Sequence, residues 1–187
     1  MTKIRAFIAL ELRNEEVVNK LEQMAVTIAK LGGIKAVERE NLHVTLKFLG
    51  DIEEETAKKI ARFLHEKINP VLFPHGGSPI EVVGVGTFRL NIIFANIGMG
   101  VELVTKAFRD VEDGLVKNFA IPREQKAYHP HITLARVKNL PGPATSRLKT
   151  LLSEKENMSF GESKVDGVVL KKSQLTPKGP IYFDVTF

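Results

Sequence analysis

His43-Val-Thr-Leu-Lys-Phe-Leu-Gly50 and His131-Ile-Thr-Leu-Ala-Arg136 are the two stretches that decide how this chain folds. Both begin with the tetrapeptide His-x-Thr-Leu. The chain has five histidines, and for its composition two such matches arise by chance with a probability of roughly 4 × 10⁻⁴. Residues two apart in a strand share a face. Each motif therefore predicts a strand that turns its histidine and threonine outward to solvent and its two apolar residues into the core.

The elements around the two motifs recur in the same order. A strand at 3–11 and a helix precede the first motif, and a strand at 92–95 and a helix at 104–119 precede the second. The spacing between matching positions grows by one residue per element. Those positions are Ala9 with Ala95, Val17, Leu21, Met24 and Ile28 with Val104, Phe108, Val111 and Leu115, and His43 with His131. This regularity predicts a duplicated strand–helix–strand–helix unit.

Turn and cap residues mark the boundaries of these elements. Asn14 is the expected N-cap of the first helix, which Gly32-Gly33 ends. Asp51 and Glu54 resemble a capping box that opens a helix near 53–68. The Pro- and Gly-rich segment 69–79 is the expected joint between motif-bearing halves of about 1–78 and 79–187, packed as two lobes of a single domain, 1–187. A helix near 144–154 and strands at about 162–172 and 180–187 complete the chain.

Composition limits the class of protein. With 187 residues, 43% hydrophobic and 26% charged, the chain has the size and make-up of one globular domain, which excludes intrinsic disorder. No apolar run is long enough for a membrane span or a signal peptide, so we expect a cytoplasmic protein with no membrane partner. The absence of cysteine excludes disulfides and thiolate chemistry. A net charge of +5 mildly favours a polyanionic partner, and nothing points to an obligate protein partner.

The paired motifs suit phosphoryl chemistry. Two imidazoles that face each other across a cleft can place a base and an acid on opposite sides of one phosphorus, as in-line displacement requires. Histidine can fill either role near neutral pH, so the residues alone leave the assignment open. Thr45 and Thr133 can donate hydrogen bonds to the non-bridging oxygens. Arg136 lies on the opposite face of a regular strand, so it joins them only if the strand twists or bulges.

At this level of detail the sequence resembles the 2H phosphoesterases. The resemblance rests on the two motifs, on the opening Arg5-Ala-Phe-Ile-Ala9, and on His129-Pro-His-Ile-Thr-Leu-Ala-Arg136. Within that group it is most similar to the RNA 2′,3′-cyclic phosphodiesterases, also named 2′-5′ RNA ligases. The family has an Arg-Pro-Arg-Val-Leu-Trp-like run where this chain has Arg89-Leu-Asn-Ile-Ile-Phe94, so its grip on RNA is expected to differ there.

The resemblance implies a fold, a reaction and roles. The fold is α+β and bilobal with a pseudo-two-fold, an antiparallel sheet in each lobe lining a central cleft, and helices outside. The reaction is the metal-free, cofactor-free opening of a terminal 2′,3′-cyclic phosphate on RNA, tRNA fragments among the candidates, together with reversible 2′-5′ RNA ligation. His43 would be the proton donor and His131 the proton acceptor. Thr45 and Thr133 would bind the phosphate.

Two alternatives remain open at this stage. One is a metal-dependent phosphohydrolase, because His129 and His131 share a strand face and could ligate zinc. The other is a non-catalytic RNA-binding module that uses the more basic second half and a phenylalanine platform. Phe7 and Phe48 are candidates for base stacking, but core packing is the favoured interpretation of both. Phe48 lies on the core side of a regular strand.

Overall fold

The computed structural model describes residues 1–187 and has an α+β fold built on one large antiparallel sheet. Along the sheet the strands run in the order β7, β4, β5, β6, β3, β1, β8, β9, and β2 pairs with β6. The two motif strands therefore lie side by side at the centre. The strand bounds are β1 Lys3–Glu11, β2 Ile34–Ala36, β3 His43–Glu53, β4 Ser78–Phe88, β5 Ile92–Ile97, β6 His131–Val137, β7 Ser159–Val165, β8 Val168–Thr176 and β9 Gly179–Asp184.

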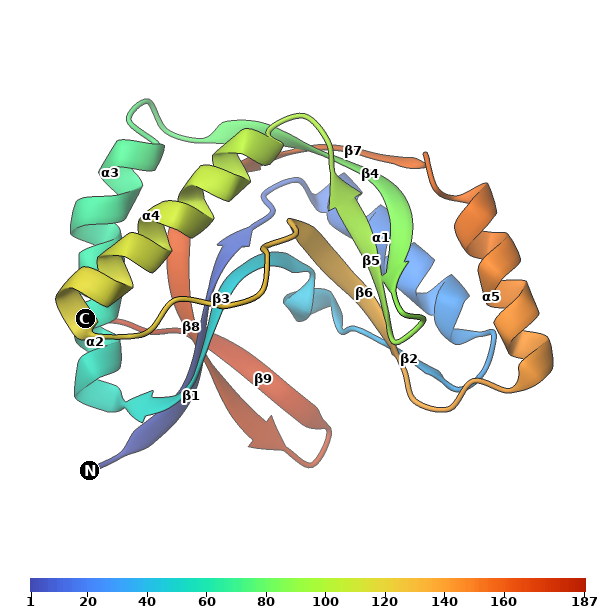
Figure 1. Ribbon diagram of the computed structural model, residues 1–187, viewed down its shortest axis with the longest axis horizontal. Helices are drawn as coiled ribbons and strands as arrows, with labels where there is room; N and C mark the ends of the chain where they lie inside the picture. Colours follow the sequence, from blue (N-terminus) through green and yellow to red (C-terminus); the bar gives the residue numbers. More distant parts are fainter.

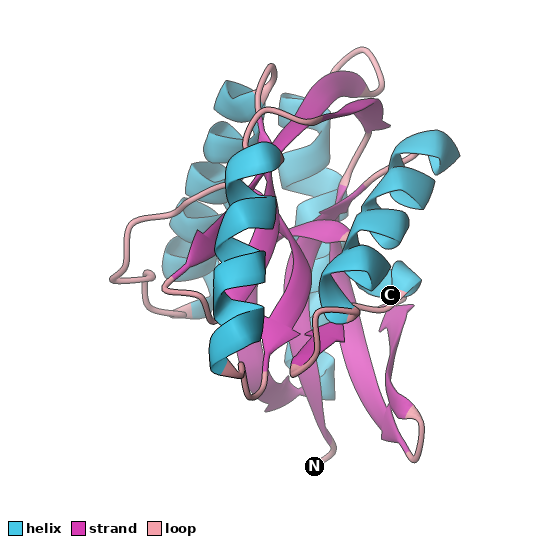
Figure 2. Ribbon diagram, turned by 90° about the vertical axis from the view of Figure 1, so that its right-hand side faces the viewer, coloured by secondary structure: helices cyan, strands magenta, loops and turns pink.

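The helices pack outside the sheet (Figures 1 and 2). They are α1 Glu15–Ala29, α2 Glu54–Phe63, α3 Asn69–Leu72, α4 Val101–Phe119 and α5 Gly142–Glu154, with a 3₁₀ turn at Arg39–Asn41 and a π turn at Leu64–Ile68. None of them combines the length and the apolar character needed to cross a membrane. Figure 1 shows α2, α3 and α4 on one side of the central strands and α1 and α5 on the other.

The two lobes exchange helices. We define lobe 1 by β1, β3, β8 and β9 with α2, α3 and α4, and lobe 2 by β2, β4, β5, β6 and β7 with α1 and α5. Although α1 follows β1 in the chain, it packs on β2, β6 and β7 of lobe 2. In the same way α4 follows β5 but packs on β3 of lobe 1. The strands of the two lobes pair at a single position, Val44 with Ile132. The exchanged helices α1 and α4 add contacts that hold the two lobes together.

The first helix forms as its sequence predicts. Asn14 is its N-cap, and the Asn14 side chain accepts a hydrogen bond from the backbone N–H of Glu16 at 2.9 Å. The predicted apolar stripe is buried from Val17 to Ile28. Burial of both motif leucines, of Val44 and of Ile132 also confirms which face of each motif strand meets the core.

Three boundaries differ from the expectation. No capping box forms at Asp51, because β3 continues to Glu53 and Asp51 is paired with Arg5 in the sheet. The helix predicted over 53–68 is regular only to Phe63 and continues through the π turn into α3, so the predicted loop 69–79 begins as helix. The helix predicted near 144–154 is confirmed as α5.

The strand pattern misled at two further points. β4 was not predicted, since its Gly84 and Gly86 interrupt the apolar pattern. The run 162–172 is two strands, β7 and β8, which lie in different lobes on either side of Asp166-Gly167. The prediction of one continuous strand over 162–172 is therefore wrong.

The register also corrects one of the repeat matches. In lobe 1 Ala9 lies opposite Thr45, and in lobe 2 Phe94 lies opposite Thr133. Ala9 is therefore equivalent to Phe94 and not to Ala95. The duplicated order of strands is confirmed by the arrangement of β1 beside β3 and of β5 beside β6.

Candidate active site

The predicted site residues gather around one cavity of about 1160 Å³, which His43, Thr45, His131 and Thr133 all line. Their arrangement follows from the pairing of Val44 with Ile132. If the register continued for one residue in each direction, as in a regular antiparallel pair, His43 would lie opposite Thr133 and Thr45 opposite His131. The Cα atoms of the two histidines would then be diagonal neighbours, about 7–8 Å apart. One small group can fit between two such imidazoles.

Each motif strand carries a bulge at the same place. In lobe 1 Ala9 pairs with Thr45 and Ile8 with Lys47, so Leu46 has no partner. In lobe 2 Phe94 pairs with Thr133 and Ile93 with Ala135, so the leucine of the second motif is skipped in the same way. A bulge bends the strand and turns the residues beyond it.

The residue five places after each histidine therefore reaches the cavity, as Phe48 in lobe 1 and Arg136 in lobe 2. The prediction that Phe48 packs in the core is wrong, because its side chain is 71% exposed. The condition set for Arg136, a bulge in its strand, is met. Phe7 is buried, but it lies outside the core cluster and lines the cavity, where its ring stacks on His43.

One ring nitrogen of His131, Nδ1, makes a hydrogen bond, and the other, Nε2, makes none. Its Nδ1 lies 2.6 Å from the backbone oxygen of His129, and a carbonyl can only accept, so Nδ1 carries the proton. Nε2 of the neutral ring then keeps a free lone pair. Burial lowers the pKa of His131, the His129 carbonyl opposes this, and the charges of His129 and Arg136 lower it further.

His43 is more enclosed than an outward position predicts. Its side chain is buried, with the ring stacked on Phe7 at 5.1 Å between centroids and 20° between planes. Burial lowers the pKa of His43 to about 4, and the positive charge of Lys171 acts in the same direction, against the Glu40 carbonyl. The expectation of a solvent-facing imidazole is therefore wrong for His43, because the β1 aromatic ring covers it.

Comparison with known proteins identifies the family. A model described as the AKAP7 2′5′ RNA ligase-like domain matches residues 6–185. The RNA 2′,3′-cyclic phosphodiesterase of Methanocaldococcus jannaschii is 32% identical, over 96% of each chain. That of Methanothermobacter thermautotrophicus is 34% identical, over 98% of this chain and 97% of its own. The chain belongs to the 2H phosphoesterases.

Solved structures agree with this placement. TT0787 of Thermus thermophilus is 28% identical and superimposes with a TM-score of 0.71, covering 97% of this chain and 94% of its own. Escherichia coli LigT complexed with 3′-AMP shares only 18% identity, but its TM-score of 0.74 over 98% of this chain and 95% of its own shows the same fold. The bilobal α+β fold expected of a 2H phosphoesterase is confirmed.

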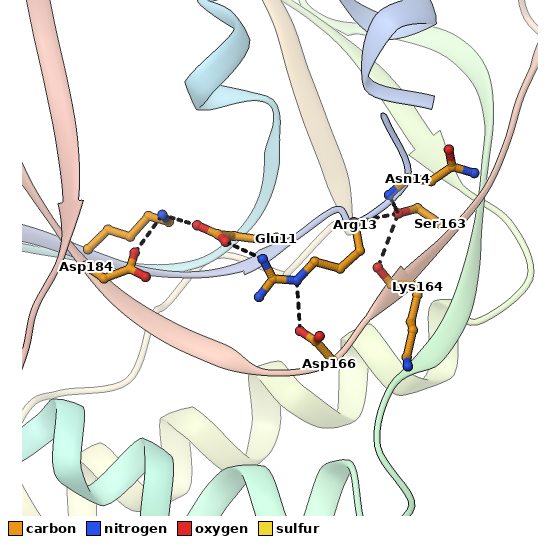
Figure 3. A network of polar contacts seen from close by, with 8 residues as sticks. Glu11, Arg13, Asn14, Ser163, Lys164, Asp166 and Asp184 are labelled. Carbon is orange, nitrogen blue, oxygen red and sulfur yellow. Dashed lines mark hydrogen bonds and ion pairs between the residues drawn. The ribbon is translucent and has the colours of Figure 1, made fainter. Parts of the chain in front are cut away.

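Lys171 lies near His43 and is held by two carboxylates. The sequence of this phosphoesterase did not predict its role at the site. The ammonium of Lys171 bonds to Asp184 at 2.8 Å and to Glu11, the β1 partner of His43. Burial alone would lower the pKa of Lys171, but the bonds to Asp184 and Glu11 outweigh burial and raise it. In Figure 3 Glu11 is held in turn by Arg13. The lysine thus stays charged next to His43. Its contacts are long-range, so no local pattern announced it.

The walls of the phosphoesterase cleft differ between the lobes. In lobe 1 Phe7, which is stacked on His43, meets Tyr182 edge to face at 5.1 Å and Phe48 at 6.1 Å. Lobe 2 contributes four cations that line the cavity without an ion-pair partner within 4.0 Å: Lys35, Arg89, Arg136 and Lys138. Lobe 1 also contributes one cation, Arg5, and lobe 2 one aromatic ring, Phe88, so the walls differ in balance: the exposed ring of Phe48 is in lobe 1 and most unpaired cations are in lobe 2.

The alternative of a zinc site at His129 and His131 has little support from the side chains around them. The rings of His129 and His131 are 6.0 Å apart between centroids, and His131 Nδ1 faces a backbone carbonyl. His129 Nε2 is 3.1 Å from Oδ1 of Asn96. No cluster of three or more His, Cys, Asp or Glu side chains suited to a metal ion forms here or elsewhere. His129 acts here through its backbone oxygen, which orients His131.

Proposed function

We propose that this 2H phosphoesterase is an RNA 2′,3′-cyclic phosphodiesterase, which hydrolyses a terminal 2′,3′-cyclic phosphate and leaves a 2′-phosphate. The observation that carries the proposal is the meeting of both His-x-Thr motifs at one cavity. The names of the relatives from Methanocaldococcus and Methanothermobacter support the same reaction. We further propose that the enzyme acts on RNA in the cytoplasm.

His131 is the base. With its proton on Nδ1, held by the His129 carbonyl, the free Nε2 can take a proton from an attacking water. Burial keeps this imidazole neutral at neutral pH. A 5′-hydroxyl in place of that water would give 2′-5′ ligation by the same proton transfers.

His43 is the acid, which gives its proton to the departing 3′ oxygen. In the free protein its pKa of about 4 leaves it mostly neutral at pH 7. A phosphate anion bound beside the ring favours the charged form and raises that pKa. Substrate binding thus supplies the protonation that the step requires. Thr45 and Thr133, one beside each histidine, donate to the non-bridging oxygens as their charge grows, and Arg136 adds a positive charge nearby.

The position of the acid orients the RNA. Because His43 protonates the 3′ oxygen, the terminal ribose lies over lobe 1, where Phe48 and Tyr182 line the cavity. The exposed ring of Phe48 can stack on the terminal base, an interaction worth about 1–3 kcal/mol. The unpaired cations of lobe 2 attract the phosphate backbone.

The test is turnover of an oligoribonucleotide with a 2′,3′-cyclic phosphate end, in the presence of excess chelator. We expect a product with a 2′-phosphate, and loss of turnover in His43→Ala and His131→Ala. No turnover by the wild-type enzyme would favour the binding-module alternative. Turnover that chelator abolishes and zinc restores would favour the metal alternative.

A further inference from the structure

The segment that joins α4 to β6, residues 120–130, contacts both motif strands and the ring of His131. This segment, which we call the strap, contains no helix or strand. Its residues Glu124, Lys126, Tyr128 and His129 form part of the cavity wall. Its end also holds the carbonyl of His129, which receives the Nδ1–H of His131 at 2.6 Å. The strap thus supplies the only hydrogen-bond partner of the His131 ring.

A buried ion pair anchors the first part of the strap. Lys47 Nζ of β3 lies 2.7 Å from Glu112 Oε1 of α4, with the two side chains only 7% and 4% exposed. The lysine also donates to the backbone oxygen of Pro122 at 2.8 Å. The second oxygen of Glu112 accepts from the backbone N–H of Glu124, also at 2.8 Å. Both ends of the pair are thus bonded to the strap backbone.

Tyr128 anchors the other end. Its hydroxyl donates to the backbone oxygen of Thr45 at 2.9 Å, on the strand that carries His43. Its ring stacks on Phe108 of α4 at 4.2 Å between centroids and 5° between planes. Two hydrogen bonds, from Lys47 to Pro122 and from Tyr128 to Thr45, therefore join the strap to β3. The second motif begins directly after the strap, at His131.

Stability alone does not account for the ion pair. Removing two charges from water is costly, and replacing a buried pair by apolar side chains of similar volume is often neutral or stabilising. We propose that Lys47, Glu112 and Tyr128 are positioning residues that, through the strap, fix His131 relative to His43. The proposal rests on the proposed function. None of the three side chains is assigned a contact with the reacting atoms.

The first experiment separates positioning from stability. In the double variant Lys47→Met/Glu112→Leu we expect a melting temperature equal to or above that of the wild type. We expect kcat for a nucleoside 2′,3′-cyclic phosphate to fall about 10- to 100-fold, the cost of a base displaced by about 1 Å. KM should change less than threefold because the phosphate contacts remain. A folded double variant with kcat within twofold of wild type would overturn the proposal.

Tyr128→Phe is the second variant, and it decides the question if the double variant does not fold. It removes one hydroxyl and keeps the Phe108 stack, so we expect a folded protein with kcat about tenfold lower. The matched control is Asp113→Asn, because the Asp113–Arg123 pair also joins α4 to the strap but is exposed on both sides. The control should keep kcat within twofold. An unchanged kcat in Tyr128→Phe would contradict the proposal.

The leaving group identifies which histidine the strap positions. A substrate whose leaving group is acidic enough to depart without a proton bypasses His43 but still needs a base. We expect the strap variants to stay slow with it, like His131→Ala. Recovery like that of His43→Ala would overturn the assignment to His131. Because wild-type turnover is measured alongside, its absence would reject the proposed function instead.

Discussion

Alike in sequence, the two motif histidines have different surroundings. His43 is buried against Phe7 with the charged Lys171 nearby, whereas His131 is half-buried between the edges of Phe88 and Phe94. Burial lowers both pKa values, more clearly for His43. The free enzyme at neutral pH therefore holds two neutral imidazoles, and in the proposed mechanism His43 takes up its proton when the phosphate binds.

The division of roles can be tested by substitution. Removing either imidazole should lower kcat by about 10²–10⁴, which is typical of one positioned proton-transfer group. With a leaving group that needs no proton, His43→Ala should recover much of its rate, while His131→Ala stays slow because water still needs a base. Thr45→Ala should be slow with both substrates. Recovery of His131→Ala alone would mean that the roles are exchanged.

The pKa values also predict the pH dependence of the rate. One histidine must be protonated and the other neutral, so kcat/KM should follow a bell whose limbs belong to the coupled pair. Since both pKa values lie below 6.5 in the free enzyme, the optimum should lie below pH 6.5. Lys171→Met removes a positive charge beside His43 and should move the bell to higher pH. A profile that is identical in this variant would count against the electrostatic role of Lys171.

At the scale of elements, the bulge at each motif leucine determines what the cleft contains. It turns Phe48 and Arg136 into the cavity from positions that a regular strand would direct away from it. The same feature in both lobes gives two different side chains, an aromatic ring in one and a cation in the other. The duplicated backbone thus provides equivalent positions, and divergence of the side chains makes the two walls unlike.

Phe48→Ala tests this consequence of the bulge. Losing one base stack worth about 1–3 kcal/mol should raise KM for an oligonucleotide substrate roughly 5- to 150-fold. The melting temperature should hardly change, because the ring is exposed. Phe7→Ala is the contrasting variant, since truncating a buried phenylalanine costs about 3–5 kcal/mol of stability. An equal loss of stability in both variants would contradict the exposed position of Phe48 and indicate that its ring packs in the core.

At the scale of the whole molecule, protonation of the buried His43 makes the free energy of unfolding depend on pH. Its pKa is about 4 in the folded state against 6.5 for the free side chain, so between these values only the unfolded chain binds the proton. Stability is complete above pH 6.5 and decreases as the pH falls toward 4, by about 3 kcal/mol at 1.36 kcal/mol per unit. Urea unfolding should show this loss, and a smaller loss in His43→Gln. A pH-independent difference between the two proteins would contradict it.

Local patterns were enough to predict much of this protein. A two-residue alternation and a three-to-four-residue stripe depend only on the geometry of one strand or one helix. The motif strands, the capped first helix, the duplicated order of elements and the residues around the cleft could therefore be predicted from the sequence. Together with the family resemblance, the paired motifs also indicated the reaction.

Only the tertiary structure decided the remaining features. The exchange of α1 and α4 between lobes, the crossing from β7 to β8, and the bulges beside the motif leucines depend on which strand lies next to which. The cover of Phe7 over His43, the charge of Lys171 and the strap held by Lys47 and Glu112 are contacts between residues far apart in the chain. A single strand or helix carries no record of its neighbours, so its pattern could predict which way His43 faces but not what surrounds it.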